Sequence, residues 1–215
     1  MDGKKILYQG GEGEIVEKKS RFIATVCPAE SEEEATAFIA SMKKKYWDAT
    51  HNCSAFVVGE TQTLQRCSDD GEPSGTAGRP MLDVLLGEKI CNVVVVVTRY
   101  FGGTLLGTGG LVRAYSKAVQ EGLKNCTVIE KRQGYLLEVK TDYSGIGKIQ
   151  YLLGQRGLAI TNSEYTDLVK IETLVPEEEK KKLLEDITEV TNGRAEFLRE
   201  DKVCYAFVDG EPMIF

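Results

Sequence analysis

The chain has 215 residues, of which 42% are hydrophobic and 28% charged, and its formal net charge at pH 7 is −6. This composition is typical of a globular protein with one large core or two small ones, and it excludes a disordered or fibrous chain. The acidic balance also argues against a protein that coats nucleic acid with its whole surface, although it allows a local basic groove.

The amino terminus shows no apolar signal region, and no apolar run reaches the roughly 20 residues that a membrane-spanning helix needs. The six cysteines form no Cys-x-x-Cys pair, so we expect reduced and mostly buried thiols. We therefore predict a cytosolic protein with no membrane partner, no metal site and no cofactor.

The first fifty residues predict two strands followed by a helix. Residues 12–27 alternate between apolar and polar side chains around a turn with Lys18, Lys19 and Arg21, whose charges we interpret as solvated. Ser31, with Glu34 three residues later, forms a capping box at the start of the predicted helix.

A second pair of strands, 54–58 and 63–67, leads into a polar loop from Ser68 to Gly78. We expect Thr76 to cap a short apolar helix after this loop. Gly87 ends that helix in the prediction, just before the most regular pattern in the chain.

Candidate groups for catalysis lie in this part of the sequence. His51 is the only histidine, and the loop holds Asp69, Asp70 and Glu72. A lone histidine is more often a packing residue than a catalyst, and acids in a loop are more often turn formers than metal ligands. Imidazole and carboxylate are nevertheless the groups that acid–base catalysis and Mg²⁺ binding use. His51, Asp70 and Glu72 are therefore catalytic candidates beside this structural interpretation.

Residues 93–97 are five consecutive valines. An unbroken β-branched run predicts a strand that is buried on both faces and lies in the middle of a sheet. Arg99 follows the run, and we predict that it marks an exposed strand end, because an unpaired guanidinium inside the core would be costly.

A glycine turn follows this strand and leads into a helix with Thr108 as its expected N-cap. Amide groups at a helix start and nearby arginines favour an anion. The residues of this candidate anion or nucleic-acid site are Arg99, Gly102, Gly103, Gly107, Gly109, Gly110 and Arg113. The alternative is a tight corner packed by Tyr100 and Phe101, and the glycine spacing matches neither a dinucleotide fingerprint nor a P-loop.

The composition changes in residues 127–133, a polar stretch that we interpret as a connector between domains 1–130 and 134–215. The second domain shows strands at 134–141, 158–165, 168–174 and 204–208, with helices at 143–156 and from Pro176 onward. The order βαββαβ predicts a ferredoxin-like sandwich.

Several motifs of the first domain together resemble the YigZ/IMPACT family. They are Ser20-Arg21-Phe22, His51-Asn52-Cys53, the loop from Ser68 to Gly78, and Arg99-Tyr100-Phe101-Gly102-Gly103 with Gly107, Gly110 and Arg113. The resemblance covers nearly the whole chain. It implies an α+β fold of two domains, an α/β domain similar to domain IV of elongation factor G and a ferredoxin-like domain similar to its domain V. Eukaryotic IMPACT restrains a starvation-sensing kinase, so the resemblance implies regulation of translation in a stress response.

Two functional hypotheses follow. The leading one is a non-enzymatic cytosolic module that binds RNA, the ribosome or a translation-related protein, with Arg99 to Arg113 as an anion-binding edge. In its protein-binding version Tyr100 and Phe101 are the aromatic anchors. The alternative is an enzyme acting on a phosphorylated metabolite or nucleotide, with phosphate on the glycine turn. The alternative requires the loops of His51 and Asp70 to converge on that turn, and the oligomeric state is left open.

Overall fold

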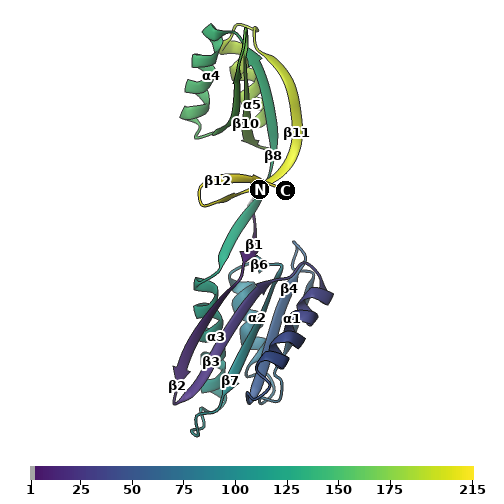
Figure 1. Ribbon diagram of the computed structural model, residues 1–215, viewed down its shortest axis with the longest axis vertical. Helices are drawn as coiled ribbons and strands as arrows, with labels where there is room; N and C mark the ends of the chain where they lie inside the picture. The colour runs from purple at the N-terminus through teal and green to yellow at the C-terminus, as the bar shows by residue number, and fades with distance from the viewer. Residues whose placement is uncertain (1–2) are drawn as a thin grey trace. The chain divides into compact units, whose positions relative to one another are not determined.

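The computed structural model describes residues 3–215 and divides into two compact units, Lys4–Glu130 and Lys131–Phe215. Both units combine helices with sheets, so the predicted α+β architecture of two domains is confirmed (Figure 1). Over the described residues, the structure contains no helix that is both long and apolar enough to cross a membrane.

The amino-terminal unit is built on a five-stranded antiparallel sheet in the order β2-β3-β7-β4-β5. These strands are β2 (Gly11–Glu17), β3 (Ser20–Pro28), β4 (His51–Val58), β5 (Leu64–Ser68) and β7 (Val93–Tyr100), and the helices are α1 (Glu32–Lys45), α2 (Gly78–Gly87) and α3 (Thr108–Lys124). β1 (Lys4–Gln9) pairs in parallel with β6 (Ile90–Cys91). The sequence pattern did not predict this pair, because a strand of two residues is too short to show a period.

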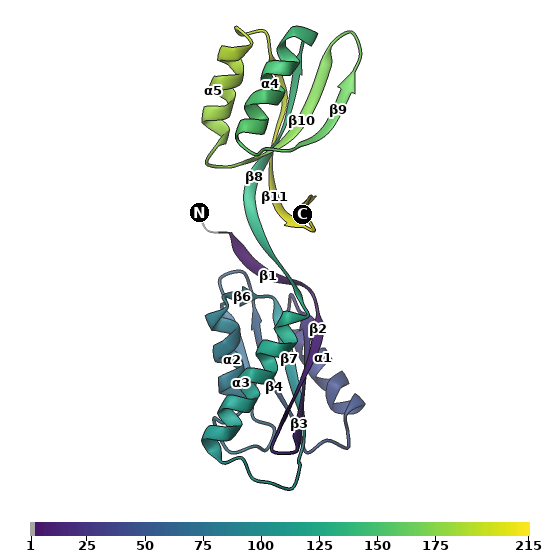
Figure 2. The same cartoon turned by 90° about the vertical axis from the view of Figure 1, so that its left-hand side faces the viewer.

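The valine run forms the centre of the sheet, as predicted. Val93, Val95 and Val97 belong to the core on the side of α2 and α3, whereas Val94 belongs to the core under α1. Figure 2 shows the sheet between α1 on one side and α2 and α3 on the other. Because helices cover both faces, β7 needs no polar face, and this explains its unbroken apolar sequence.

The carboxy-terminal unit is a ferredoxin-like sandwich, which confirms the prediction. Its elements are β8 (Thr127–Thr141), which begins before the boundary, α4 (Tyr143–Gln155), β9 (Ile160–Tyr165), β10 (Val169–Pro176), α5 (Lys180–Val190), β11 (Glu196–Val208) and β12 (Glu211–Ile214). The strands pair in the order β9-β10-β8-β11. Helices α4 and α5 cover one face of the sheet and contribute Ile149 and Leu183 to its core (Figure 2).

Two boundaries in this half were predicted wrongly. Residues 127–133 are the first half of strand β8, not a connector. Helix α5 begins at Lys180, not at Pro176, because Pro176 still pairs with Gly134 at the end of β10. The three glutamates that follow Pro176 form a turn, and the pattern did not indicate strand β12.

Two glycines of helix α4 should respond oppositely to alanine. A Cβ at Gly145 would lie 2.2 Å from Oγ1 of the buried Thr141, whereas nothing lies within 4 Å of a Cβ at Gly147. We expect Gly145→Ala to destabilise the unit and Gly147→Ala to stabilise it by about 0.5–1 kcal/mol, the helix-propensity difference between the residues. Urea unfolding of both variants tests this, and a shift in the same direction for both would contradict the packing described.

Candidate functional site

Four segments that are far apart in the sequence meet around the carboxylate of Glu72. They are the start of β4, the loop 68–78, the end of β7 and the second turn of α3, which contribute His51, Glu72, Arg99 and Tyr115. The loops of His51 and Asp70 therefore converge on Glu72 and Arg99, whereas the enzyme hypothesis places their convergence on the glycine turn. In the described part of the chain none of these side chains forms a hydrogen bond or ion pair with Arg113.

Glu72 is the centre of this cluster and is 7% exposed. Its Oε1 accepts hydrogen bonds from Arg99 Nη1 at 2.5 Å and from the Tyr115 hydroxyl at 2.8 Å. A carboxylate that receives a guanidinium and a phenol in the interior is satisfied by charge-assisted hydrogen bonds. The loop 68–78 is thereby fixed to the sheet and to α3.

Arg99 is buried at 5% exposure, so the prediction of an exposed strand end is wrong. The cost of burying a guanidinium is offset here because Glu72 supplies the opposite charge. The Arg99 guanidinium also lies over the rings of Phe22 and Phe101, at 5.3 and 5.6 Å from their centroids. Its Nη2 donates to Ser20 Oγ at 3.4 Å, while its Nε has no partner among the described residues.

His51 lies at the edge of the cluster with its side chain 19% exposed. Its Nδ1 is 2.8 Å from the backbone carbonyl oxygen of Asp70. Because a carbonyl oxygen only accepts, Nδ1 carries the proton in this arrangement. The other ring nitrogen, Nε2, then faces Glu72 Oε2 at 3.9 Å, so the imidazole and the carboxylate are neighbours without a direct hydrogen bond.

The remaining acids of the loop have structural partners. Asp70 accepts from Lys43 Nζ at 2.5 Å and from the Asn52 amide at 2.7 Å, so both of its oxygens are engaged. Among the residues that the structure describes, no group of three or more His, Cys, Asp or Glu side chains has the geometry to hold a metal ion.

Asp69, not Thr76, caps helix α2. Its Oδ1 accepts from the amides of Ala77 and Gly78, at 3.0 and 2.8 Å, and its Oδ2 accepts from the amide of Gly75 at 2.8 Å. Burial raises the pKa of this carboxyl, but the three backbone hydrogen bonds outweigh burial and lower the pKa below its ordinary value. Thr76 instead donates its hydroxyl to the Pro73 carbonyl oxygen at 2.6 Å.

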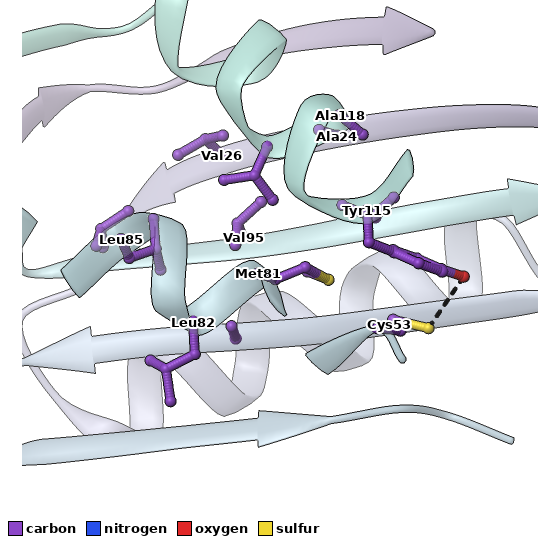
Figure 3. Packing of buried hydrophobic residues seen from close by; sticks show 14 of the residues in the cluster. Ala24, Val26, Cys53, Met81, Leu82, Leu85, Val95, Tyr115 and Ala118 are labelled. Carbon is purple, nitrogen blue, oxygen red and sulfur yellow. Dashed lines mark hydrogen bonds between the residues drawn. The ribbon is translucent and has the colours of Figure 1, made fainter. Parts of the chain in front are cut away.

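Cys53 and Tyr115 complete the buried side of the cluster (Figure 3). Burial raises the pKa of the Cys53 thiol to about 12, and burial likewise raises the pKa of Tyr115. Both groups therefore keep their protons at neutral pH. The thiol lies 3.3 Å from the Tyr115 hydroxyl, which in turn donates to Glu72. A protonated thiol in this position is a packing group and not an activated nucleophile.

The glycine turn has an architectural part and an open part. A Cβ at Gly102 would lie 2.1 Å from the Lys19 backbone, and the Gly102 amide donates to Ser20 Oγ at 3.1 Å. Gly103 and Gly107 adopt positive φ values of 79° and 74°. The N-cap of α3 is Gly107, not Thr108, so in the described structure the first amides of this helix receive no hydrogen bond from an N-cap side chain.

Arg113 is exposed and lies in a different environment from Arg99. A Cβ built at Gly109 would be 3.6 Å from its Nη1, so the guanidinium lies beside the first turn of α3. Arg113 also lines a cleft of about 220 Å³ together with Lys18 and Lys117. The sequence placed both arginines at one anion site, but Arg99 is buried against Glu72, whereas Arg113 is exposed at this cleft.

Exposed aromatic and apolar side chains lie next to the turn. Phe101 is 47% exposed above the Arg99 guanidinium, whereas the Tyr100 hydroxyl is engaged as a donor to Asp48 at 2.9 Å. The bond from Tyr100 brings the segment after α1 to the turn, and Trp47 in this segment is 82% exposed. Leu105 within the turn is 81% exposed.

Sequence reasoning missed several of these residues. Lys117 follows Arg113 by one helical turn, and this spacing could have indicated a shared face. Trp47 and Leu105 gave no signal, because a single apolar residue in a loop is compatible with burial or exposure. The role of Ser20, which joins Arg99 to Gly102, depends on contacts across about eighty residues and could not be deduced from local pattern.

Comparison with known proteins gives consistent matches over both units. Residues 18–123 match the model of the Impact N-terminal domain, and residues 139–194 match a domain of unknown function, DUF1949. The chain is 45% identical over 197 residues to the IMPACT family member YvyE of Bacillus subtilis (strain 168), covering 92% of this chain and 90% of that protein. It is 41% identical over 161 residues to the IMPACT family member YigZ of Escherichia coli (strain K12), covering 74% and 79%. One solved structure, a crystal structure of a hypothetical protein, is 34% identical with a TM-score of 0.58 and covers 94% of this chain and 98% of that chain.

Replacing Glu72 should be strongly destabilising. Glu72→Gln keeps the shape of the side chain but leaves the buried guanidinium of Arg99 without an opposite charge, and we expect a loss of about 3–5 kcal/mol in the free energy of unfolding. Glu14→Gln is the matched control, because Glu14 pairs with Arg21 on the surface, and it should change stability far less. Urea unfolding gives the free energy of unfolding of both variants. Equal losses of stability would contradict a buried ion pair whose partners depend on each other.

The cap formed by Asp69 should be sensitive to acid. Its lowered pKa means that the unfolded chain binds a proton more readily, so its contribution is present above about pH 4 and is lost as pH falls through the native pKa. We expect Asp69→Asn to cost about 1 kcal/mol at pH 7, with the difference from wild type narrowing in acid. The control is Asp83→Asn, because Asp83 forms an exposed ion pair with Arg79. Unfolding of both variants is measured at pH 7 and in acid. A difference that stays constant with pH would contradict the proposed cap.

Proposed function

This chain belongs to the IMPACT family, and we propose that it is a translation-associated regulatory protein that acts by binding RNA or the ribosome. The binding end is formed by the glycine turn and the segments beside it. It consists of the exposed residues Trp47, Phe101 and Leu105 together with Lys18, Lys19, Lys44, Lys45, Arg113 and Lys117. The resemblance to eukaryotic IMPACT supports the translational setting, and the chemistry of this end supports RNA.

One observation carries the proposal: the binding end gathers unpaired positive charge in a protein whose net charge is −6. Within the described chain, none of its six cations has a carboxylate oxygen within ion-pair distance. Elsewhere in the described part of this unit, Lys4, Arg66, Arg79 and Lys124 are each paired with an acid, whereas Lys5 and Lys89 form no ion pair. The acidic total therefore does not oppose a local electropositive surface.

The two kinds of side chain at the binding end suit single-stranded or splayed RNA. Lysine and arginine side chains contact phosphates and position a nucleic acid without reading its sequence. Exposed aromatic rings such as Trp47 and Phe101 provide faces on which bases stack. Phe101 is held in place from below by Arg99, so little flexibility has to be lost when a base stacks on it.

The enzymatic alternative is less well supported by the cluster around Glu72. Its carboxylate is committed to Arg99 and Tyr115, and both oxygens of Asp70 are engaged by Lys43 and Asn52. His51 is bonded to the backbone of the same loop. These contacts explain the three candidate residues as supports of the fold. We therefore assign the function to the outer surface and not to this cluster.

Titration with a structured RNA at several salt concentrations tests the proposal. We expect micromolar binding that weakens steeply between about 50 and 300 mM salt. The double variant Lys44→Gln/Lys45→Gln should reduce the salt slope by about 2, and Trp47→Ala should cost about 1–3 kcal/mol of binding free energy. Arg99→Ala is unsuitable, because it breaks the buried pair.

The matched control is Lys181→Gln/Lys182→Gln, a pair of exposed lysines on α5 of the other unit. This variant should bind RNA as wild type does. Absence of RNA binding would overturn the proposal, as would an equal loss in the α5 control.

A further inference from the structure

The cleft between β2 and the first turns of α3 differs from the rest of the binding end in being a recess. It encloses about 220 Å³ and is lined by Lys18 and Glu17 at the end of β2, and by Arg113 and Lys117 on α3, over a floor of Ile15, Leu106 and Ala114. We infer that this cleft binds a 5′-phosphorylated nucleotide, either free or at the 5′ end of an RNA. The inference rests on the proposed function in naming the ligand group that the binding end recognises.

Three cations face this cleft without an ion pair to any acid that the structure describes, and this arrangement works against stability. Arg113 and Lys117 are four residues apart on one helix face, where like charges repel. Lys18 adopts a positive φ of 45°, a conformation that glycine or asparagine adopts at lower cost. No acid among the described residues forms an ion pair with these three cations, and a bound anion would supply the missing opposite charge. A phosphate monoester carries about −1.5 to −2 charges near pH 7 and three acceptor oxygens, which suits three cations.

The floor of the cleft narrows the choice of anion. Ile15 and Leu106 are partly buried apolar side chains packed on the core, and Ala114 is 3% exposed. Inorganic phosphate offers nothing to an apolar surface. A nucleotide has a flat base that can lie on such a floor while its phosphate reaches the cations. Inside a duplex, base pairing and stacking keep the base away from such a recess, whereas the base and the phosphate of a single-stranded 5′-terminal nucleotide can enter it together.

Among the described residues that line the cleft, Glu17 is the only acid, and it provides a further test. Its carboxylate lines the same cleft as the three cations, yet no cation lies within ion-pair distance of it in the described chain. For an incoming phosphate it is a like charge. Its removal should therefore strengthen phosphate binding, while removal of any of the cations should weaken it.

The experiment compares one single-stranded oligoribonucleotide with a 5′-phosphate and with a 5′-hydroxyl, and tests adenosine 5′-monophosphate by calorimetry. We expect wild type to bind the phosphorylated form about 10-fold more tightly, the effect of one or two charge-assisted hydrogen bonds. The ratio of the two affinities, 5′-phosphate over 5′-hydroxyl, should fall to about 1 in Arg113→Gln and should increase in Glu17→Gln. Lys44→Gln, outside the cleft, should weaken both oligonucleotides alike and leave the ratio unchanged.

The outcomes separate the two proposals. An affinity ratio near 10 in wild type that falls to about 1 in Arg113→Gln supports a 5′ end of RNA as the ligand. Binding of adenosine 5′-monophosphate to wild type that is lost in Arg113→Gln supports a free nucleotide. Nucleotide binding without RNA binding would support the cleft and overturn the proposed function. A ratio near 1 without nucleotide binding, or a ratio that Arg113→Gln leaves unchanged, overturns the inference even where RNA binds. Arg113 is exposed, and a circular dichroism spectrum like that of wild type shows that the variant is folded.

Discussion

The ion pair between Glu72 and Arg99 is the interaction on which the binding end of the molecule depends. Two charges are removed from water, which costs several kcal/mol per ion unless each finds a partner. Tyr115 completes the carboxylate, and Ser20 accepts from both the guanidinium and the amide of Gly102. One pair thus joins the acidic loop, strands β3 and β7, helix α3 and the glycine turn. The buried ion pair therefore determines where the exposed residues of the binding end lie.

The two arginines of the glycine-turn motif, Arg99 and Arg113, therefore have different roles. Arg99 and Arg113 are fourteen positions apart, and both looked like parts of one anion site. Arg99 is paired in the interior and its guanidinium lies under the Phe101 ring, whereas Arg113 lines the cleft with Lys18 and Lys117 and forms no ion pair with any described residue. An acidic net charge of −6 is therefore compatible with a local group of cations that have no ion pair among the described residues.

Much of the fold could be predicted from the sequence, because local pattern determines it. Five valines require a strand covered on both faces, and the periodicity of the second half was sufficient for its βαββαβ order. The burial of Arg99 could not be predicted, because its partner lies 27 positions away and is brought close only by folding. The cap of α2 by Asp69 in place of Thr76 could not be predicted either, because the Asp69 carboxylate reaches amides eight and nine positions away only when the loop has folded.

The most direct test of this account is the mapping of amide chemical shifts while a 5′-phosphorylated RNA is added to isotopically labelled protein. We predict that the largest chemical-shift changes will occur at the amides of Lys18, Lys19 and the segment from Phe101 to Lys117. Amides of α4 and α5 should not respond. Changes centred on those two helices, or none in the glycine turn, would contradict the assignment of binding to this end of the molecule.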